Sequence, residues 1–191
     1  MSDKYKIHNN ETAYFLTMTV VEWIDLFTRK ELKMCFIDSL DYCQKHKGLM
    51  IFAYCLMPSH CHMICMADES ANLSAILRDL KKYTSKKIIT TIKAFPESRR
   101  SWLLNLLSKA GNHYKRKQNY KVWQTGNNAK EIYSSAYLYE KLNYIHYNPV
   151  KDMIVCNPED YFFSSARNYA GLDGVLDVVV LKSKPLRESW I

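Results

Sequence analysis

The sequence lacks the features that would place it in a secretory pathway or a membrane. None of its six cysteines belongs to a CxxC pair, and the opening residues, MSDKYKIHNN, contain no apolar core of a signal peptide. No apolar stretch approaches the roughly 18 residues that a membrane-spanning helix needs. We therefore expect a cytoplasmic protein with no membrane role, whose thiols are reduced and act largely as small apolar side chains.

Internal repeats and low-complexity linkers are also absent. A chain of 191 residues, 48% hydrophobic and 24% charged, is long enough to bury a substantial core. We expect a single domain over residues 1–191, with its core in about residues 13–170 and a less patterned tail. Basic residues outnumber acidic ones by 27 to 19, which is compatible with a polyanionic partner such as nucleic acid but does not establish one.

The apolar periodicity predicts an α+β sandwich in which antiparallel strands are flanked by helices. Strands are expected at residues 13–21, 49–57 and 60–67, with the last two joined by a tight turn at Pro58 and Ser59. Helices are expected at about 29–46, 72–94, within 96–120, and from Ser134 or Ser135 onward. We expect Pro149 to end the last helix at Asn148, YKVWQ to be extended, and Trp102 to lie in the core.

Two histidines, His60 and His62, lie one residue apart in the third predicted strand. Side chains alternate along a strand, so both rings should point to one face, with Cα atoms about 7 Å apart. Two imidazoles at this spacing can bind one cation. Cys61 and Cys65 would point the other way, which argues against a mixed Cys/His zinc site. Histidines at this spacing are also common as surface or hydrogen-bonded core groups.

The last predicted helix, within SSAYLYEKLNYIHYNPVK, carries two stripes at helical spacing. The apolar stripe, expected to face the core, is formed by Leu138, Leu142 and Ile145. The second stripe is formed by Tyr137, Lys141, Tyr144 and Asn148. A phenol can act as a nucleophile and a carboxamide oxygen suits Mg²⁺ or Mn²⁺. With 14 tyrosines in the chain, spacing alone does not select Tyr144 over its neighbours, and a simple packing helix fits the pattern too.

Four segments together resemble a known family. MPSHCHMI resembles the histidine-hydrophobe-histidine motif of the HUH single-tyrosine transposases. YIHYNPVK is similar to the tyrosine-bearing helix of their relatives associated with repetitive extragenic palindromes (REP), as are KVWQ before it and PEDYFFSSARNY after it. The resemblance covers roughly residues 13–170. Asn128 and Ala129 depart from it, because relatives often carry histidine and proline there.

The resemblance implies a ferredoxin-like sandwich that cleaves and rejoins single-stranded DNA next to hairpins. It implies that His60, His62 and Asn148 bind a divalent metal, Mg²⁺ or Mn²⁺. It also implies that Tyr144 attacks a phosphodiester to leave a 5′-phosphotyrosine link and a free 3′-hydroxyl, with no nucleotide cofactor. Related enzymes include monomers and dimers whose tyrosine helix serves the partner's histidines, so the oligomeric state stays open.

Basic residues form the predicted DNA-binding surface. Four lysines of one helix are expected to gather on a broad face, although such a face is often only solvated. Beside a phosphodiester-cleaving site they become a candidate phosphate track. The complete set is Lys81, Lys82, Lys86, Lys87, Arg99, Arg100, Lys115, Arg116 and Lys117.

Two other functions remain open at this point. The protein could be a binding module that binds DNA hairpins without cutting them. A binding module has no chemical need of His60, His62 and Tyr144 together. Alternatively, the histidines could hold a structural zinc in a protein of unrelated function.

Overall fold

A computed structural model describes residues 7–113 and 118–181 of the chain. The described strands are β1 (Tyr14–Thr19), β2 (Leu49–Leu56), β3 (His60–Ala67) and β4 (Lys130–Glu131). The described α-helices are α1 (Lys30–Lys47), α2 (Leu73–Ala94), α3 (Arg100–Asn112), α4 (Ser135–Lys151) and α5 (Ala166–Tyr169). Short 3₁₀ turns span Val21–Trp23 and Pro158–Asp160.

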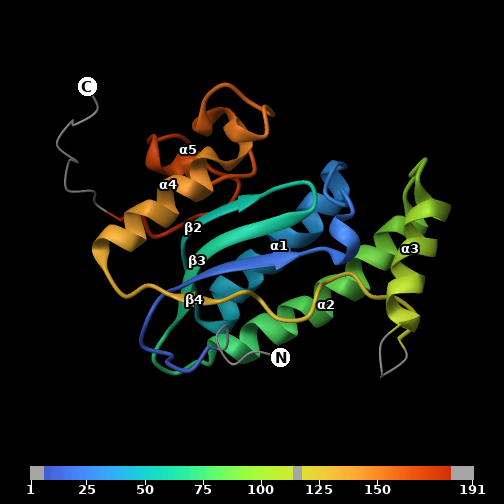
Figure 1. The fold of residues 1–191 in the computed structure, drawn as a ribbon, viewed down its shortest axis with the longest axis horizontal. Helices are drawn as coiled ribbons and strands as arrows, with labels where there is room; N and C mark the ends of the chain where they lie inside the picture. The colour runs from blue at the N-terminus through green and yellow to red at the C-terminus, as the bar shows by residue number, and fades with distance from the viewer. Residues whose placement is uncertain (1–6, 114–117, 182–191) are drawn as a thin grey trace.

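The strands form one antiparallel sheet in the order β2-β3-β1-β4. Helices α1 and α2 cover one face and α4 covers the other (Figure 1). The predicted α+β sandwich is therefore confirmed. The two strands with the most apolar sequence, β2 and β3, are joined by the predicted tight turn, in which the N–H of Met57 donates to the carbonyl of His60 at 2.8 Å.

Alternation along the strands divides the core between the two faces. On β3, Cys61, Met63 and Cys65 are fully buried against α1 and α2, whereas Ile64 packs under α4. The register of β1 with β3 pairs Thr17 with His62 and Thr19 with His60. His60 and His62 lie two and four positions before Ile64, so their side chains point to the same face of β3 as Ile64. Both rings therefore face α4.

Helix α4 begins at a capped end and continues further than the sequence predicted. The Ser134 side chain accepts a hydrogen bond from the N–H of Tyr137 at 3.2 Å, an N-cap arrangement. The predicted end at Asn148 is wrong, since α4 runs through Pro149 to Lys151. Proline so near the end removes one helical hydrogen bond, while Asp152 still donates to the Asn148 carbonyl at 3.1 Å and the Pro149 ring is buried.

Of two aromatic segments, one agrees with expectation and one does not. YKVWQ is extended, with an isolated antiparallel bridge between Val20 and Trp123 and a hydrogen bond from the N–H of Val21 to the carbonyl of Val122 at 2.9 Å. Trp102 is not in the core but half exposed on α3, while Trp123 is buried and donates its indole N–H to Thr84 Oγ1 at 2.9 Å. Apolar clustering in the sequence therefore predicted the wrong tryptophan as core. Within the described ranges, no helix combines the length and apolarity needed to cross a membrane.

Candidate active site

His60 and His62 lie side by side on the α4 face of the sheet. Their ring centroids are 4.6 Å apart, which confirms that they share one face. Phe15, on the neighbouring strand β1, stacks on the His62 ring at 5.5 Å, and Trp23 meets the His60 ring edge-on at the same distance. The two imidazoles are thus fixed between aromatic neighbours.

Hydroxyl groups orient both rings. Thr17 Oγ1 lies 3.0 Å from Nδ1 of His62, and Ser59 Oγ lies 3.1 Å from Nδ1 of His60. With Nδ1 of each ring engaged, Nε2 is the nitrogen available to a ligand. In His62 this nitrogen faces α4.

Both rings favour the neutral form that binds metals. Burial, together with the nearby His60 ring, lowers the pKa of His62 to about 3. Burial also lowers the pKa of His60, although Asp152 and Asn148 oppose this shift. A neutral imidazole offers a lone pair to a cation, whereas a protonated one does not.

Helix α4 brings Tyr144 and Asn148 to the histidines. The Tyr144 hydroxyl lies 3.4 Å from Nε2 of His62, with ring centroids 5.0 Å apart. Asn148 is one helical turn further on and buried, with only 8% of its surface exposed. Asn148 is also near enough to His60 to oppose the fall in the pKa of that ring. The phenol and the carboxamide predicted from the second stripe therefore both lie at the histidine pair.

The Asn148 side chain leaves a polar atom without a partner. Its Oδ1 is buried and makes no hydrogen bond within the described part of the chain, which is costly unless another group compensates. Two neutral imidazoles and a buried carboxamide oxygen are a donor set that fits a divalent cation. In contrast, residues 7–113 and 118–181 contain no group of three or more His, Cys, Asp or Glu side chains that could hold a metal ion. A zinc site built from those residue types alone thus finds no support there.

A cavity of about 450 Å³ opens beside these residues. It is lined by Phe15, Thr17, His62, Asn128, Lys130, Lys141 and Tyr144. Of these residues, His62, Asn128, Lys141 and Tyr144 had been singled out in the sequence, whereas Phe15, Thr17 and Lys130 had not. Those three become neighbours of the site only through the register of β1 with β3 and β4.

Of the four lysines expected on one face of α2, three lie together, and their contact with DNA stays a prediction. Lys82, Lys86 and Lys87 share one side of α2, where they line a groove of about 720 Å³ with Tyr42 and Tyr83. Lys81 does not share that side. Its ammonium donates to the backbone carbonyls of Gln124 and Gly126, so it holds the loop before β4.

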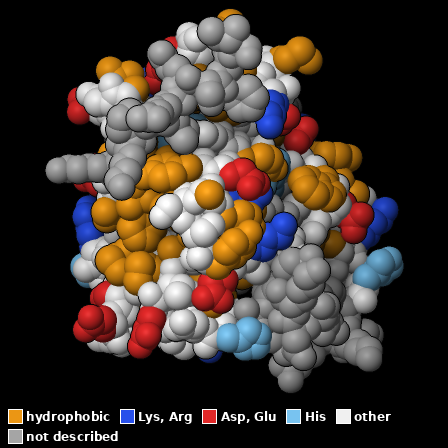
Figure 2. Space-filling view, turned by 60° about the vertical axis from the view of Figure 1, so that its left-hand side comes forward, with side chains coloured by type: hydrophobic (Ala, Val, Ile, Leu, Met, Phe, Trp, Pro, Cys, Tyr) orange, Lys and Arg blue, Asp and Glu red, His pale blue; other side chains and the backbone are white. Residues whose placement is uncertain are grey.

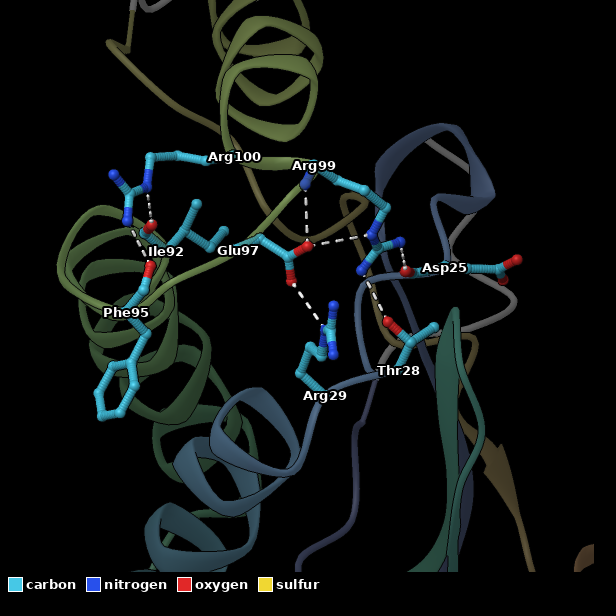
Figure 3. Close-up of polar contacts among 8 residues, drawn as sticks. All are labelled: Asp25, Thr28, Arg29, Ile92, Phe95, Glu97, Arg99 and Arg100. Atoms are coloured by element: carbon cyan, nitrogen blue, oxygen red, sulfur yellow. Dashed lines mark hydrogen bonds and ion pairs between the residues drawn. The ribbon is translucent and has the colours of Figure 1, made fainter.

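The two predicted arginines have internal partners (Figure 3). Arg99 donates to the carbonyl of Asp25 at 2.8 Å and to Thr28 Oγ1 at 2.6 Å, and it also pairs with Glu97. Arg100 donates to the carbonyls of Ile92 and Phe95. Arg100 thus joins the start of α3 to the end of α2, and Arg99 joins it to the segment that contains Asp25 and Thr28. Contact of either arginine with DNA stays a prediction. The predicted residues Lys115, Arg116 and Lys117 lie outside the described residues.

Comparison with known proteins gives a family match and a fold match. The family described as "Transposase IS200 like" matches residues 11–148. A structure of a REP-associated tyrosine transposase bound to a REP hairpin is 20% identical, with a TM-score of 0.60 and coverage of 100% of this chain and 99% of that one. A crystal structure of a protein from Deinococcus radiodurans R1, described as a candidate transposase, is 15% identical, with a TM-score of 0.43 and coverage of 76% and 95%. No curated protein matches the chain.

Proposed function

Because the chain belongs to the transposase IS200-like family, we propose that it cleaves and rejoins single-stranded DNA through Tyr144. The observation that carries this proposal is the position of the Tyr144 hydroxyl, 3.4 Å from Nε2 of His62 and one helical turn from Asn148. The sequence resemblance to single-tyrosine transposases had implied the same grouping. Tyr144 is also 36% exposed, so a DNA phosphate can reach it.

The chemistry is a transesterification at phosphorus. The Tyr144 oxygen attacks the scissile phosphate, forming a new O–P bond while the bond from phosphorus to the 3′-oxygen breaks. The phenol proton passes to solvent and the departing 3′-oxygen takes one up, so no net proton is consumed. The product is a 5′-phosphotyrosine link, which a 3′-hydroxyl can attack in the reverse sense to rejoin strands.

His60, His62 and Asn148 are the proposed holders of a divalent metal, Mg²⁺ or Mn²⁺. Such an ion would polarise the phosphate and offset the charge that develops on the departing oxygen. The chain itself keeps the two imidazoles neutral and orients them through Thr17 and Ser59. The α4 helix keeps Tyr144 and Asn148 one turn apart, so the nucleophile and the carboxamide approach the same point.

DNA is the proposed substrate, with an unpaired segment next to a hairpin as the first form to test. The related REP-associated transposase was solved with a REP hairpin, and this chain carries a net charge of +8, which favours a polyanion. The exposed lysines of α2, Lys82, Lys86 and Lys87, are available for phosphate contacts.

Covalent trapping on end-labelled DNA tests the proposal. Wild type, mixed with single-stranded hairpin oligonucleotides and Mn²⁺, should give a denaturant-resistant protein–DNA adduct on a gel. Tyr144→Phe should abolish the adduct, while Tyr147→Phe, which removes the hydroxyl of another exposed tyrosine on α4, should retain it. An adduct that survives Tyr144→Phe would refute Tyr144 as the nucleophile. DNA binding without any adduct from metal-loaded wild type would favour a binding module.

A further inference from the structure

Two stacked tyrosines stand beside the site and have no part in the cleavage chemistry. Tyr133 lies just before α4 and Tyr137 lies in its first turn, with ring centroids 4.8 Å apart and planes inclined by 16°. Tyr133 is 77% exposed. Its outer face therefore offers an aromatic surface to solvent, on the β4–α4 side of the molecule. Figure 2 brings the left-hand side of Figure 1 forward and shows hydrophobic side chains there, interspersed with separate charged ones.

One lysine connects this pair to the nucleophile. Lys141 Nζ lies 5.0 Å from the Tyr137 ring centroid, 5.8 Å from that of Tyr144 and 5.7 Å from that of Phe15. Its side chain is only 17% exposed and lines the cavity next to Tyr144. The same ammonium thus lies near the ring of Tyr137, the inner member of the stacked pair, and near the ring of the proposed nucleophile Tyr144.

The ion pair of Lys141 leaves it able to bind an anion. Its carboxylate partner, Glu140, lies 2.6 Å away and is 64% exposed. Ion pairs with a solvent-exposed partner contribute little, because water competes well for the carboxylate. Lys141 carries three N–H donors, so a phosphate oxygen in the cavity can be bound without loss of Glu140.

We propose that Tyr133, Tyr137 and Lys141 form a nucleotide subsite next to the scissile phosphate. Lys141 binds a phosphate oxygen in the cavity, and the exposed face of Tyr133 stacks on an unpaired base of the adjoining nucleotide. The Tyr137 ring supports Tyr133 from behind, and the backbone N–H of Tyr137 donates to Ser134 Oγ, which fixes this residue in the first turn of α4. This subsite rests on the proposed function, because it takes the DNA strand that Tyr144 would cut.

The chemistry of the subsite favours an unpaired base over a paired one. Every base has a flat π-face that can stack on an aromatic ring, and base–aromatic stacking typically changes affinity by roughly 5- to 100-fold. A base inside a duplex has both faces covered by its neighbours. The subsite thus provides a physical reason for a single-stranded segment at the cut.

Fluorescence of 2-aminopurine tests the stacking. The Tyr144→Phe protein, which cannot form the proposed link, is titrated into a set of single-stranded hairpin oligonucleotides that carry 2-aminopurine at successive unpaired positions. We expect quenching at one or two adjacent positions. Adding Tyr133→Leu should weaken binding roughly 5- to 100-fold and remove the quenching, whereas Tyr133→Phe, which keeps the ring, should preserve both. Tyr147→Leu serves as the matched exposed-tyrosine control and should also preserve both.

An abasic oligonucleotide separates stacking from folding effects. With the base removed at the quenched position, Tyr133→Leu and its parent should bind equally. If the leucine variant binds the intact oligonucleotide as well as its parent, or loses the same affinity on the abasic one, the base-stacking role is wrong. Because binding is measured in the Tyr144→Phe protein, it does not depend on cleavage. If quenching is seen there while wild type forms no adduct, the proposed cleavage is refuted and the subsite is supported.

The salt dependence of binding tests Lys141. Lys141→Met should weaken binding and reduce the magnitude of the slope of log affinity against log salt by about 1, the amount expected for one lost phosphate contact. Lys141→Arg should keep most of that slope. The loss should be the same for intact and abasic oligonucleotides, because the lysine contacts phosphate rather than base. A slope unchanged by Lys141→Met would exclude this lysine from the subsite.

Discussion

At the scale of single residues, the orientation of the histidine pair depends on hydroxyl groups that the sequence does not mark. Thr17 lies 45 positions before His62 and yet reaches its Nδ1 at 3.0 Å. The histidines could be predicted because alternation along one strand is local. Thr17 could not, because its contact comes from the pairing of β1 with β3. Contacts between distant segments leave no periodic pattern in the sequence.

Replacing Thr17 should weaken metal binding without removing a ligand. When Nε2 of His62 binds the metal, Nδ1 carries the proton and donates it to Thr17 Oγ1. Thr17→Val takes this oxygen away, so the ring loses its fixed tautomer and orientation. We expect Mn²⁺ affinity to fall roughly 10- to 100-fold, as is typical when the hydrogen-bond partner of a metal-binding histidine is removed. Thr17→Ser should stay near wild type. Electron paramagnetic resonance of free Mn²⁺ measures the affinity of each variant. Equal Mn²⁺ affinities of Thr17→Val and wild type would contradict the proposed role of Thr17 in orienting His62.

The unpartnered Asn148 oxygen gives a second expectation at this scale. If this oxygen donates a lone pair to the cation, Mn²⁺ should raise the melting temperature of wild type, because the ion binds only the folded protein. In Asn148→Leu, a similarly sized side chain without the oxygen, that rise should shrink even if the metal-free variant is as stable as wild type. Thermal unfolding with and without Mn²⁺ gives the comparison, and an equal rise in both proteins would remove Asn148 from the ligand set.

At the scale of elements, helix α4 and the loop before β4 place the site's components. The second stripe of α4 was predictable because 3.6-residue periodicity is local, and Lys141, Tyr144 and Asn148 do face the site. The end of α4 was not predictable from Pro149. The helix continues past it because the proline ring is buried and the N–H of Asp152 still donates to the carbonyl of Asn148. The role of Lys81 was likewise hidden, since its acceptors lie more than forty residues away.

Lys81 should matter for stability, in contrast to its neighbours on α2. Its ammonium donates to two loop carbonyls, and Asn127 in the same loop accepts from the N–H of Thr17 at 2.8 Å. Lys81→Met leaves those carbonyls without their donor, so we expect a loss of about 1–3 kcal/mol in the free energy of unfolding. Lys86→Met, at an exposed position, should stay within about 0.5 kcal/mol of wild type. Urea denaturation distinguishes them, and equal stabilities would contradict the loop contact.

The contact between α4 and the segment before α5 should make stability depend on pH. His146 Nε2 lies 2.9 Å from Ser165 Oγ, and burial lowers the pKa of His146 to about 4, against about 6.5 in an unfolded chain. Between these values the unfolded state binds more protons, so stability is lost as pH falls from about 6.5 to 4 and levels off below.

The His146 shift corresponds to about 3 kcal/mol over that range. His146→Gln should flatten the fall in stability, because glutamine does not titrate. Urea denaturation of both metal-free proteins at successive pH values tests this. His62 adds a slope of the same sign in both proteins, so the difference between them isolates His146, and identical pH profiles would contradict the assignment.

At the scale of the whole molecule, the sandwich brings both halves of the site together within one chain. The sheet contributes His60 and His62, and α4, which follows more than seventy residues later, contributes Tyr144 across the same face. The family resemblance allowed either this arrangement or one in which the tyrosine helix serves a partner. A contact of 3.4 Å between Tyr144 and His62 of the same chain supports action in cis.

Mixing two inactive variants tests whether the site is complete in one chain. His62→Ala and Tyr144→Phe should each form no covalent adduct with a hairpin oligonucleotide in Mn²⁺. If the nucleophile acts in cis, every molecule in an equimolar mixture still lacks one component, so no adduct should appear. Mixtures of wild type with either variant should retain activity in proportion to the wild type present, which shows that the variants do not simply sequester DNA. An adduct in the mixture of the two variants would instead require that Tyr144 of one chain reaches the histidines of another, and the site would then be one shared between two chains.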